Sequence, residues 1–225
     1  MPQRSTPNTL HDPDQRRRGR AVLRDADPAL GDLVERFGDV WPRRRVPVFE
    51  RLCRIVIDQQ LSVKAAATIA ERLRRTAGGR LRADRLHGLD DAALRGAGLS
   101  RQKTAALRDL VEHVRSGRLR TDQLWRLPDD EITERLGAVR GFGPWSVEMF
   151  LLFGLGRADV WATGDLGLRR AVQELDGHAA APHAPAMIAR AERWRPWRGL
   201  ASLYLWASLE PVLWSEPAAD RNRSL

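Results

Sequence analysis

Residues 136–168 read LGAVRGFGPWSVEMFLLFGLGRADVWATGDLGL, and this stretch contains the signals that decide the fold. An apolar helical pattern over 129–138 ends just before Gly141 and Gly143, and Pro144 suits the first position of a second helix. The stretch therefore predicts two short helices joined by a tight, glycine-bounded hairpin.

The hairpin has residue types that suit an anion. Glycine permits a positive φ at the turn and lets another backbone approach closely, while unpaired amides at the start of the second helix favour negative charge. Phe142, between the glycines, is expected to be buried and to anchor the hairpin to the hydrophobic core. A GxG pattern by itself is weak evidence, so an ordinary helix-turn-helix corner stays open as the alternative. The residues predicted to contact phosphate here are Arg140, Gly141, Gly143 and Ser146.

The chain carries a strong positive charge. Its 225 residues have a formal net charge of +9, and the 38 basic residues are all arginine except Lys64 and Lys103. Such an excess favours a polyanionic partner such as nucleic acid. Residues 1–25 are polar, arginine-rich and without apolar periodicity, which predicts a disordered tail, and we expect a second disordered tail over 216–225. The predicted folded part is 26–215, divided into two helical subdomains.

Between these tails the sequence predicts a succession of helices, and it contains no run of alternating β-branched residues that would predict a strand. Ser62, Asp90 and Ser100 each precede an apolar helical pattern and are expected helix N-caps. Most connections are short, so the predicted fold class is all-α with a compact body. The expected helices cover 28–37, 46–59, 62–76, 90–97, 101–116, 121–126, 129–138, 144–154, 165–175, 185–194 and 197–213.

Composition excludes several kinds of site. Cys53 is the only cysteine and lies in an apolar stretch, so we expect a buried structural thiol and no disulfide, cysteine zinc site or iron–sulfur cluster. The five histidines show no metal-ligand spacing and are expected on the surface, so no metal site is predicted. No segment has the roughly 18 consecutive apolar residues of a membrane span, and no signal peptide is visible. We expect a soluble, cytoplasmic protein associated with the nucleoid.

Asp165 is the candidate catalytic carboxylate. It follows Thr163 and Gly164 and precedes an apolar helical pattern, so its simplest role is helix N-cap. The second helix of the hairpin, however, leads the chain to this aspartate with little slack. A carboxylate held there would face DNA gripped by the hairpin.

Five segments together resemble a known family, the helix-hairpin-helix DNA glycosylases, and within it the AlkA-type 3-methyladenine DNA glycosylases. The hairpin alone is shared by many DNA-binding proteins, but the five segments in this order are specific. The resemblance runs from near Val48 to Trp214 and implies two helical lobes around a DNA-binding cleft. The segments are IVIDQQLSVKAA (55–66), GLSRQKTAAL (98–107), RGFGPWSVEMF (140–150), DVWATGDLGLRRAV (159–172) and AERWRPWRGLASLYLW (191–206).

The resemblance implies a chemistry for several positions. Asp165 matches the family's catalytic aspartate, and Gly164 replaces the first member of a common Asp-Asp pair. Relatives that also nick the strand carry a lysine nucleophile where this chain has Trp145, so we expect a glycosylase without lyase activity. The short segment before the first helix implies the compact form, without the family's extra β-containing domain. No cofactor is implied, although a monovalent cation at the hairpin is allowed.

The resemblance also implies a substrate pocket. Trp145 and Trp206 match aromatic positions that line the family's pocket, and Met149 replaces a further aromatic residue, which implies a roomier or softer pocket. Most indoles in a helical protein are core, and that interpretation is preferred for Trp194 and Trp197.

The turn Gln59-Gln60-Leu61-Ser62 lies where the family inserts a side chain into the minor groove to fill the gap left by a flipped base. Gln60 is the aligned wedge residue, with Leu61 next to it. The alternative is that Ser62 simply caps a helix and the glutamines are solvated. Lys64 and Lys103 are candidate phosphate contacts, or merely exposed.

Two functions from different classes stay open. The first is a monomeric enzyme that flips and excises alkylated bases of the 3-methyladenine or 7-methylguanine type from double-stranded DNA, which starts base excision repair. The second is a noncatalytic helix-hairpin-helix protein that binds DNA or recognises damage. A glycosylase for deaminated or mismatched bases is disfavoured by the two pocket tryptophans, and the sequence leaves the substrate range undetermined.

Overall fold

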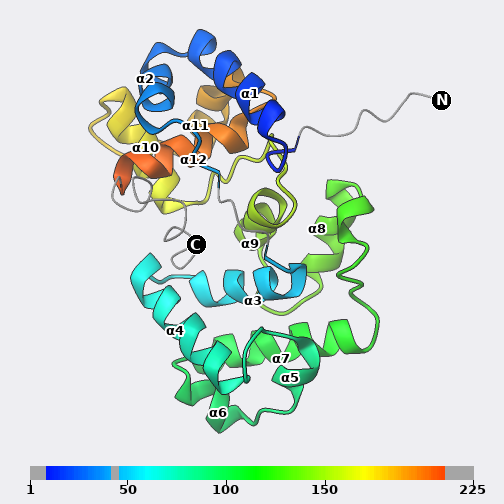
Figure 1. Ribbon diagram of the computed structural model, residues 1–225. Coiled ribbons are helices and arrows are strands. Elements are labelled where there is room, and N and C mark those ends of the chain that lie inside the picture. The colour runs from blue at the N-terminus through cyan, green and yellow to red at the C-terminus, as the bar shows by residue number, and fades with distance from the viewer. Residues whose placement is uncertain (1–8, 42–45, 211–225) are drawn as a thin grey trace, which may run out of the picture. The chain divides into compact units, whose positions relative to one another are not determined.

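A computed structural model describes residues 9–41 and 46–210, and within these ranges the chain forms twelve α-helices and no strand (Figure 1). The all-α prediction is confirmed. The helices are α1 (Pro13–Ala26), α2 (Pro28–Phe37), α3 (Val48–Asp58), α4 (Val63–Thr76), α5 (Ala83–His87), α6 (Asp91–Gly96), α7 (Arg101–Arg115), α8 (Asp129–Gly137), α9 (Pro144–Met149), α10 (Leu166–Asp176), α11 (Ala184–Ala191) and α12 (Arg198–Leu209).

The described chain divides into two compact units. One contains α1 and α2 from the start of the chain together with α10, α11 and α12, and the other contains α3 to α9. We call them the terminal unit and the central unit. None of the helices in the described ranges is both long and apolar enough to cross a membrane.

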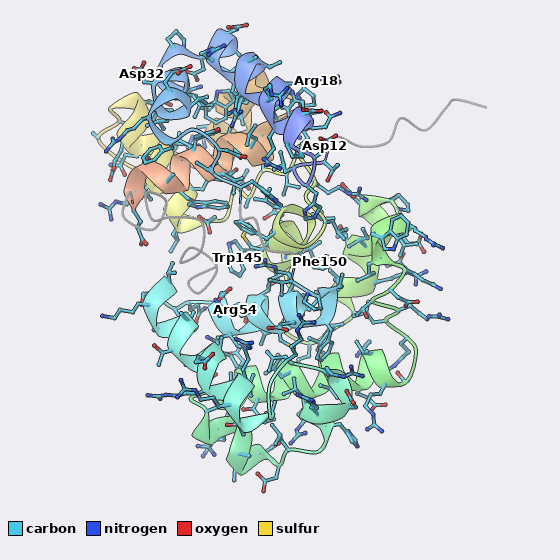
Figure 2. All side chains as sticks on the ribbon, viewed as in Figure 1. Asp12, Arg18, Asp32, Arg54, Trp145 and Phe150 are labelled. Carbon is cyan, nitrogen blue, oxygen red and sulfur yellow. The ribbon has the colours of Figure 1, made fainter. Side chains whose placement is uncertain are left out.

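The predicted disorder of residues 1–25 is wrong for the part that the structure describes, because 13–26 form helix α1. Asp12 begins this helix by accepting a hydrogen bond from the Asp14 amide at 2.9 Å (Figure 2). Leu23 is fully buried, and a Cβ at Gly19 would lie 2.7 Å from Trp197 and Leu200. The arginine-rich composition hides this narrow buried stripe. Residues 1–8 and the predicted tail 216–225 lie outside the described residues.

Arg16 shows why charge alone misled the prediction for α1. Its guanidinium is buried, donates to the Leu10 carbonyl at 2.7 Å and pairs with both carboxylate oxygens of Asp39 at 2.8 Å. An arginine counted as part of a solvated tail is therefore a structural group of the terminal unit.

The core of the terminal unit surrounds α12 and a buried polar network. Trp194 and Trp197 are buried, as predicted. Asp27, which caps α2, accepts hydrogen bonds from the Leu30 amide at 3.3 Å, the Trp194 indole at 2.9 Å and Arg190 at 2.5 Å. One carboxylate thus joins the start of α2 to the segment that follows α11.

The central unit is built on the apolar face of α3. Cys53 is fully buried in this face, and burial raises the pKa of its thiol far above the ordinary value, so the prediction of a structural thiol is confirmed. His113 on α7 is buried as well, which corrects its predicted surface position; its Nδ1 lies 2.9 Å from the Asp109 carbonyl.

Three details of the helices differ from the sequence prediction. The five-residue helix α5 was missed because it spans little more than one turn and shows no periodicity. The helix predicted over 144–154 is α-helical only to Met149 and continues as a π-helical turn over Phe150–Gly154. The segment 121–126 forms only a 3₁₀ turn over Leu124–Arg126.

Candidate active site and nucleic-acid interface

The hairpin between α8 and α9 adopts the predicted glycine turn. Gly141 has φ +83°, a conformation that favours glycine, and Phe142 is 5% exposed, so its ring anchors the hairpin in the core as expected. Gly143 instead has extended backbone at the N-cap of α9, and a Cβ there would meet nothing within 4 Å. The first glycine is required by conformation, whereas the second leaves open space in front of the helix.

Helix α7 contacts the hairpin through Asp109 and Ala106. The Arg140 amide donates to Asp109 Oδ2 at 2.7 Å, and a Cβ at Gly141 would approach Ala106 to 3.1 Å. The role of Asp109 was not predicted, because its partner lies 31 residues away and no local motif marks the pair. The Arg140 side chain is exposed, which keeps it available for a phosphate contact.

Gln59 joins the turn after α3 to the hairpin. Its side-chain amide donates to the Gly141 carbonyl at 2.8 Å and to the Ser146 hydroxyl at 3.0 Å. Ser146 is 2% exposed, and its hydroxyl contacts Gln59 inside the protein, so the predicted DNA contact of this residue stays a prediction. Gln59 was predicted to meet DNA, and the structure gives its amide a role inside the protein.

The neighbouring side chains of the turn point to solvent. Gln60 is exposed and has φ +56°, and Leu61 is 38% exposed. Ser62 caps α4 by accepting from the Ala65 amide at 3.3 Å, and Lys64 is exposed on that helix. The wedge therefore stays a prediction for Gln60 or Leu61, while Ser62 has the capping role that was weighed as its alternative.

Lys103 does not have the exposed position that a phosphate contact would use. Its ammonium donates to the Ile57 carbonyl at 2.7 Å and the Gln59 carbonyl at 2.8 Å, at the end of α3. Burial lowers the pKa of Lys103, against the opposing effect of the nearby Asp58 carboxylate. Its role is to bind carbonyls left unpaired by the helix terminus.

Asp165 lies at the N-cap of α10, half-buried, in the terminal unit. Its Oδ1 accepts from the Leu168 amide at 2.6 Å and from the Trp206 indole at 3.0 Å. These two donors fix the carboxylate from two helices, since Trp206 belongs to α12. The two interpretations of Asp165, helix N-cap and catalytic carboxylate, are therefore compatible. The capping hydrogen bond itself holds the carboxylate in place.

An aromatic wall adjoins this carboxylate. The Trp206 ring stacks on Phe153 with centroids 5.8 Å apart and 27° between their planes. Gly167 keeps the space beside the pair open, because a Cβ there would lie 3.2 Å from Asp165 Oδ1 and 3.5 Å from the Trp206 indole. Neither Phe153 nor Gly167 was predicted as a site residue. A single glycine in the first turn of a helix carries no signal for such a role.

The other predicted pocket residues belong to the central unit. Trp145 lies on the first turn of α9 and is half-buried (Figure 2). Met149, at the end of that helix, is 6% exposed. The structure therefore brings Asp165 and Trp206 together in one unit and places Trp145 and Met149 in the other. The shared pocket stays a prediction.

Replacing Trp206 by Phe separates the stacking from the hydrogen bond. We expect the Trp206→Phe variant to keep an aromatic ring against Phe153 while losing the donor to Asp165. If the chain excises bases as the sequence predicts, the single-turnover rate of base release should fall about tenfold. Thermal unfolding provides the control for folding. An unchanged rate would mean that the indole N–H does not position the carboxylate.

In the described ranges no group of three or more His, Cys, Asp or Glu side chains is arranged to hold a metal ion. A monovalent cation at the hairpin stays a prediction.

Comparison with known proteins now bears on this site. The sequence profile of the HhH-GPD superfamily base excision DNA repair proteins matches residues 53–198, which include the turn at 59–62, the hairpin and Asp165. The chain belongs to this superfamily. Its HhH-GPD match ends in α12, before Trp206.

Individual HhH-GPD relatives point in the same direction. DNA-3-methyladenine glycosylase 1 of Schizosaccharomyces pombe is 31% identical over 196 residues, 84% of this chain and 86% of that protein. The Bacillus subtilis protein YfjP is 31% identical over 170 residues, and the chain spans only 59% of its length. The solved structure of Schizosaccharomyces pombe 3-methyladenine DNA glycosylase in complex with abasic DNA matches with a TM-score of 0.80 at 30% identity, covering 85% of this chain and 96% of that one.

Proposed function

We propose that this HhH-GPD protein is a monofunctional DNA glycosylase that hydrolyses the N-glycosidic bond of alkylated purines. The observation that carries the proposal is the Asp165 carboxylate, held by the Leu168 amide and the Trp206 indole beside an aromatic wall. The similarity to 3-methyladenine DNA glycosylases, one of them in complex with abasic DNA, supports the choice of substrate.

The chemistry requires an anion more than an acid. An alkylated purine carries positive charge and leaves as a neutral base, so its departure needs little protonation. Positive charge then develops on the sugar as the glycosidic bond lengthens, and a fixed carboxylate stabilises that charge. In this mechanism Asp165 provides the anion and orients the attacking water.

Selection of the damaged base rests on the aromatic residues. A cationic ring is attracted to the electron-rich face of an indole by about 0.5 to 2 kcal/mol. Trp206, stacked on Phe153, offers such a face in the terminal unit, and Trp145 offers a second in the central unit. A neutral, undamaged purine lacks this attraction.

DNA backbone binding is assigned to the hairpin. The open space before Gly143 and the exposed Arg140 side chain suit a phosphate, and the net charge of +9 favours a polyanion. We propose that the protein is a cytoplasmic monomer that associates with the nucleoid.

The test is a base-release assay on a duplex that contains methylated purines. We expect free methylated base, with strand cleavage only after alkali, because Trp145 occupies the position where a lyase needs an amine. Borohydride should accordingly trap no covalent complex with DNA. Release of no base would contradict the glycosylase function, and a borohydride-trapped complex would contradict the absence of lyase activity.

A further inference from the structure

The wedge turn, residues 58–62, has an unusual backbone. Gln60 is the only non-glycine residue in the described ranges with a positive φ, +56°. A side chain with a Cβ rarely adopts this conformation, and it persists only where the surroundings impose it. The Leu61 amide closes the turn on the Asp58 carbonyl at 3.3 Å. Something outside the turn must therefore hold it.

Two contacts from distant parts of the sequence provide that support. Lys103 of α7 binds the Ile57 and Gln59 carbonyls, which fixes the base of the turn. The Gln59 side chain, 82 residues from its partner in sequence, binds the Gly141 carbonyl of the hairpin. Both contacts lie within the central unit, so the turn and the hairpin form one braced structure.

Gln59 uses both of its amide protons in this brace. One donates to Gly141 O at 2.8 Å and the other to Ser146 Oγ at 3.0 Å. The second acceptor, the Ser146 hydroxyl oxygen, belongs to a buried residue, so water does not compete for this hydrogen bond. A glutamine that was only solvated would not be held at two points.

We propose that Gln59 is a positioning residue that fixes the wedge turn relative to the hairpin, so that binding of a phosphate by the hairpin sets where the exposed Gln60 and Leu61 enter the duplex. The ordering of the turn is then completed in the free protein rather than during insertion, which lowers the entropic cost of binding. The inference rests on the proposed function only in requiring a duplex with a gap to fill.

The test compares two DNA duplexes. One contains a tetrahydrofuran abasic analogue opposite 2-aminopurine, whose fluorescence reports unstacking when a side chain enters the gap, and the other is undamaged. In Gln59→Met the length is kept and both donors are lost. We expect affinity for the abasic duplex to fall about tenfold, about 1.4 kcal/mol, with affinity for undamaged DNA nearly unchanged and the fluorescence response reduced.

A matched control is available on the surface of α7. Gln102 is exposed, and Gln102→Met makes the same chemical change without removing either hydrogen bond of Gln59. It should leave both affinities and the fluorescence response as in the unmodified protein. A Gln59→Met protein that folds and keeps full discrimination and full fluorescence response would overturn the inference.

Ser146→Ala provides a second variant in case Gln59→Met fails to fold. This variant removes one acceptor and leaves the bond to Gly141, so we expect discrimination between the abasic and the undamaged duplex to fall about threefold. Unchanged discrimination would overturn the inference. Combined with Gln59→Met, Ser146→Ala should add nothing further, because both act on one contact. Abasic discrimination by a protein that releases no methylated base would contradict the proposed function and leave this inference standing.

Discussion

The Asp165→Asn variant is expected to lose base release by about 10²- to 10³-fold under single-turnover conditions, because the substitution removes the charge that stabilises the sugar cation. Asparagine keeps the oxygen that accepts from the Leu168 amide and the Trp206 indole, and it is an equally good N-cap. The variant should therefore unfold at nearly the same temperature as the original protein.

DNA binding separates this effect from a structural one. Removing a carboxylate also removes its repulsion of phosphate, so affinity for a damaged duplex should be retained or increased. Quenched single-turnover reactions measure the rate, and fluorescence anisotropy measures the affinity. If Asp165→Asn released base as fast as the original protein, the carboxylate would be only a helix cap.

The Asp27→Ala variant is expected to lose about 3–5 kcal/mol of unfolding free energy, the largest effect on stability that we predict. Asp27 is 3% exposed, and its removal leaves the half-buried Arg190 charge without one of its two carboxylates. The Trp194 indole and the Leu30 amide lose an acceptor as well. Urea denaturation measures the change.

An exposed aspartate on α2 provides the control. Asp32→Ala changes the same residue type on the surface of that helix and should alter stability by less than about 0.5 kcal/mol (Figure 2). Equal effects from the two variants would contradict the buried network.

The pH dependence of stability should follow from the same carboxylate. Burial raises the pKa of Asp27, but hydrogen bonds and charge from Arg190, with the Leu30 amide and the Trp194 indole, outweigh it and leave the pKa below its ordinary value. The folded protein therefore binds this proton less readily than the unfolded chain. The contribution is fully present above about pH 4, is lost as pH falls through the folded pKa, and should be absent from Asp27→Ala.

Local signals in the sequence were sufficient for most of the helices and for the hairpin. Gly141 and Phe142 have the predicted turn and core positions, since both follow from residue types a few positions apart. Asp165 could be singled out because its cap signal and its distance from the hairpin are also local. Helix α1 was missed because its buried stripe is only a few residues wide among many arginines.

Contacts between distant residues could not be predicted in this way. Asp109, Gln59 and Lys103 act on main-chain groups of segments 31 to 82 residues away, and a main-chain acceptor leaves no mark in the sequence. The ring contact of Phe153 could not be predicted either, because its partner Trp206 belongs to a distant helix. These are the residues that turn isolated motifs into a positioned site.

The central claim is that the Asp165 carboxylate stabilises positive charge on the sugar. It is tested most directly by measuring Kd for two duplexes, one with a cationic pyrrolidine in place of the sugar and one with the neutral tetrahydrofuran analogue. We predict that the protein binds the cationic duplex at least about tenfold more tightly and that Asp165→Asn loses this preference. Equal affinity for the two duplexes, or a preference that persists in Asp165→Asn, would contradict the account.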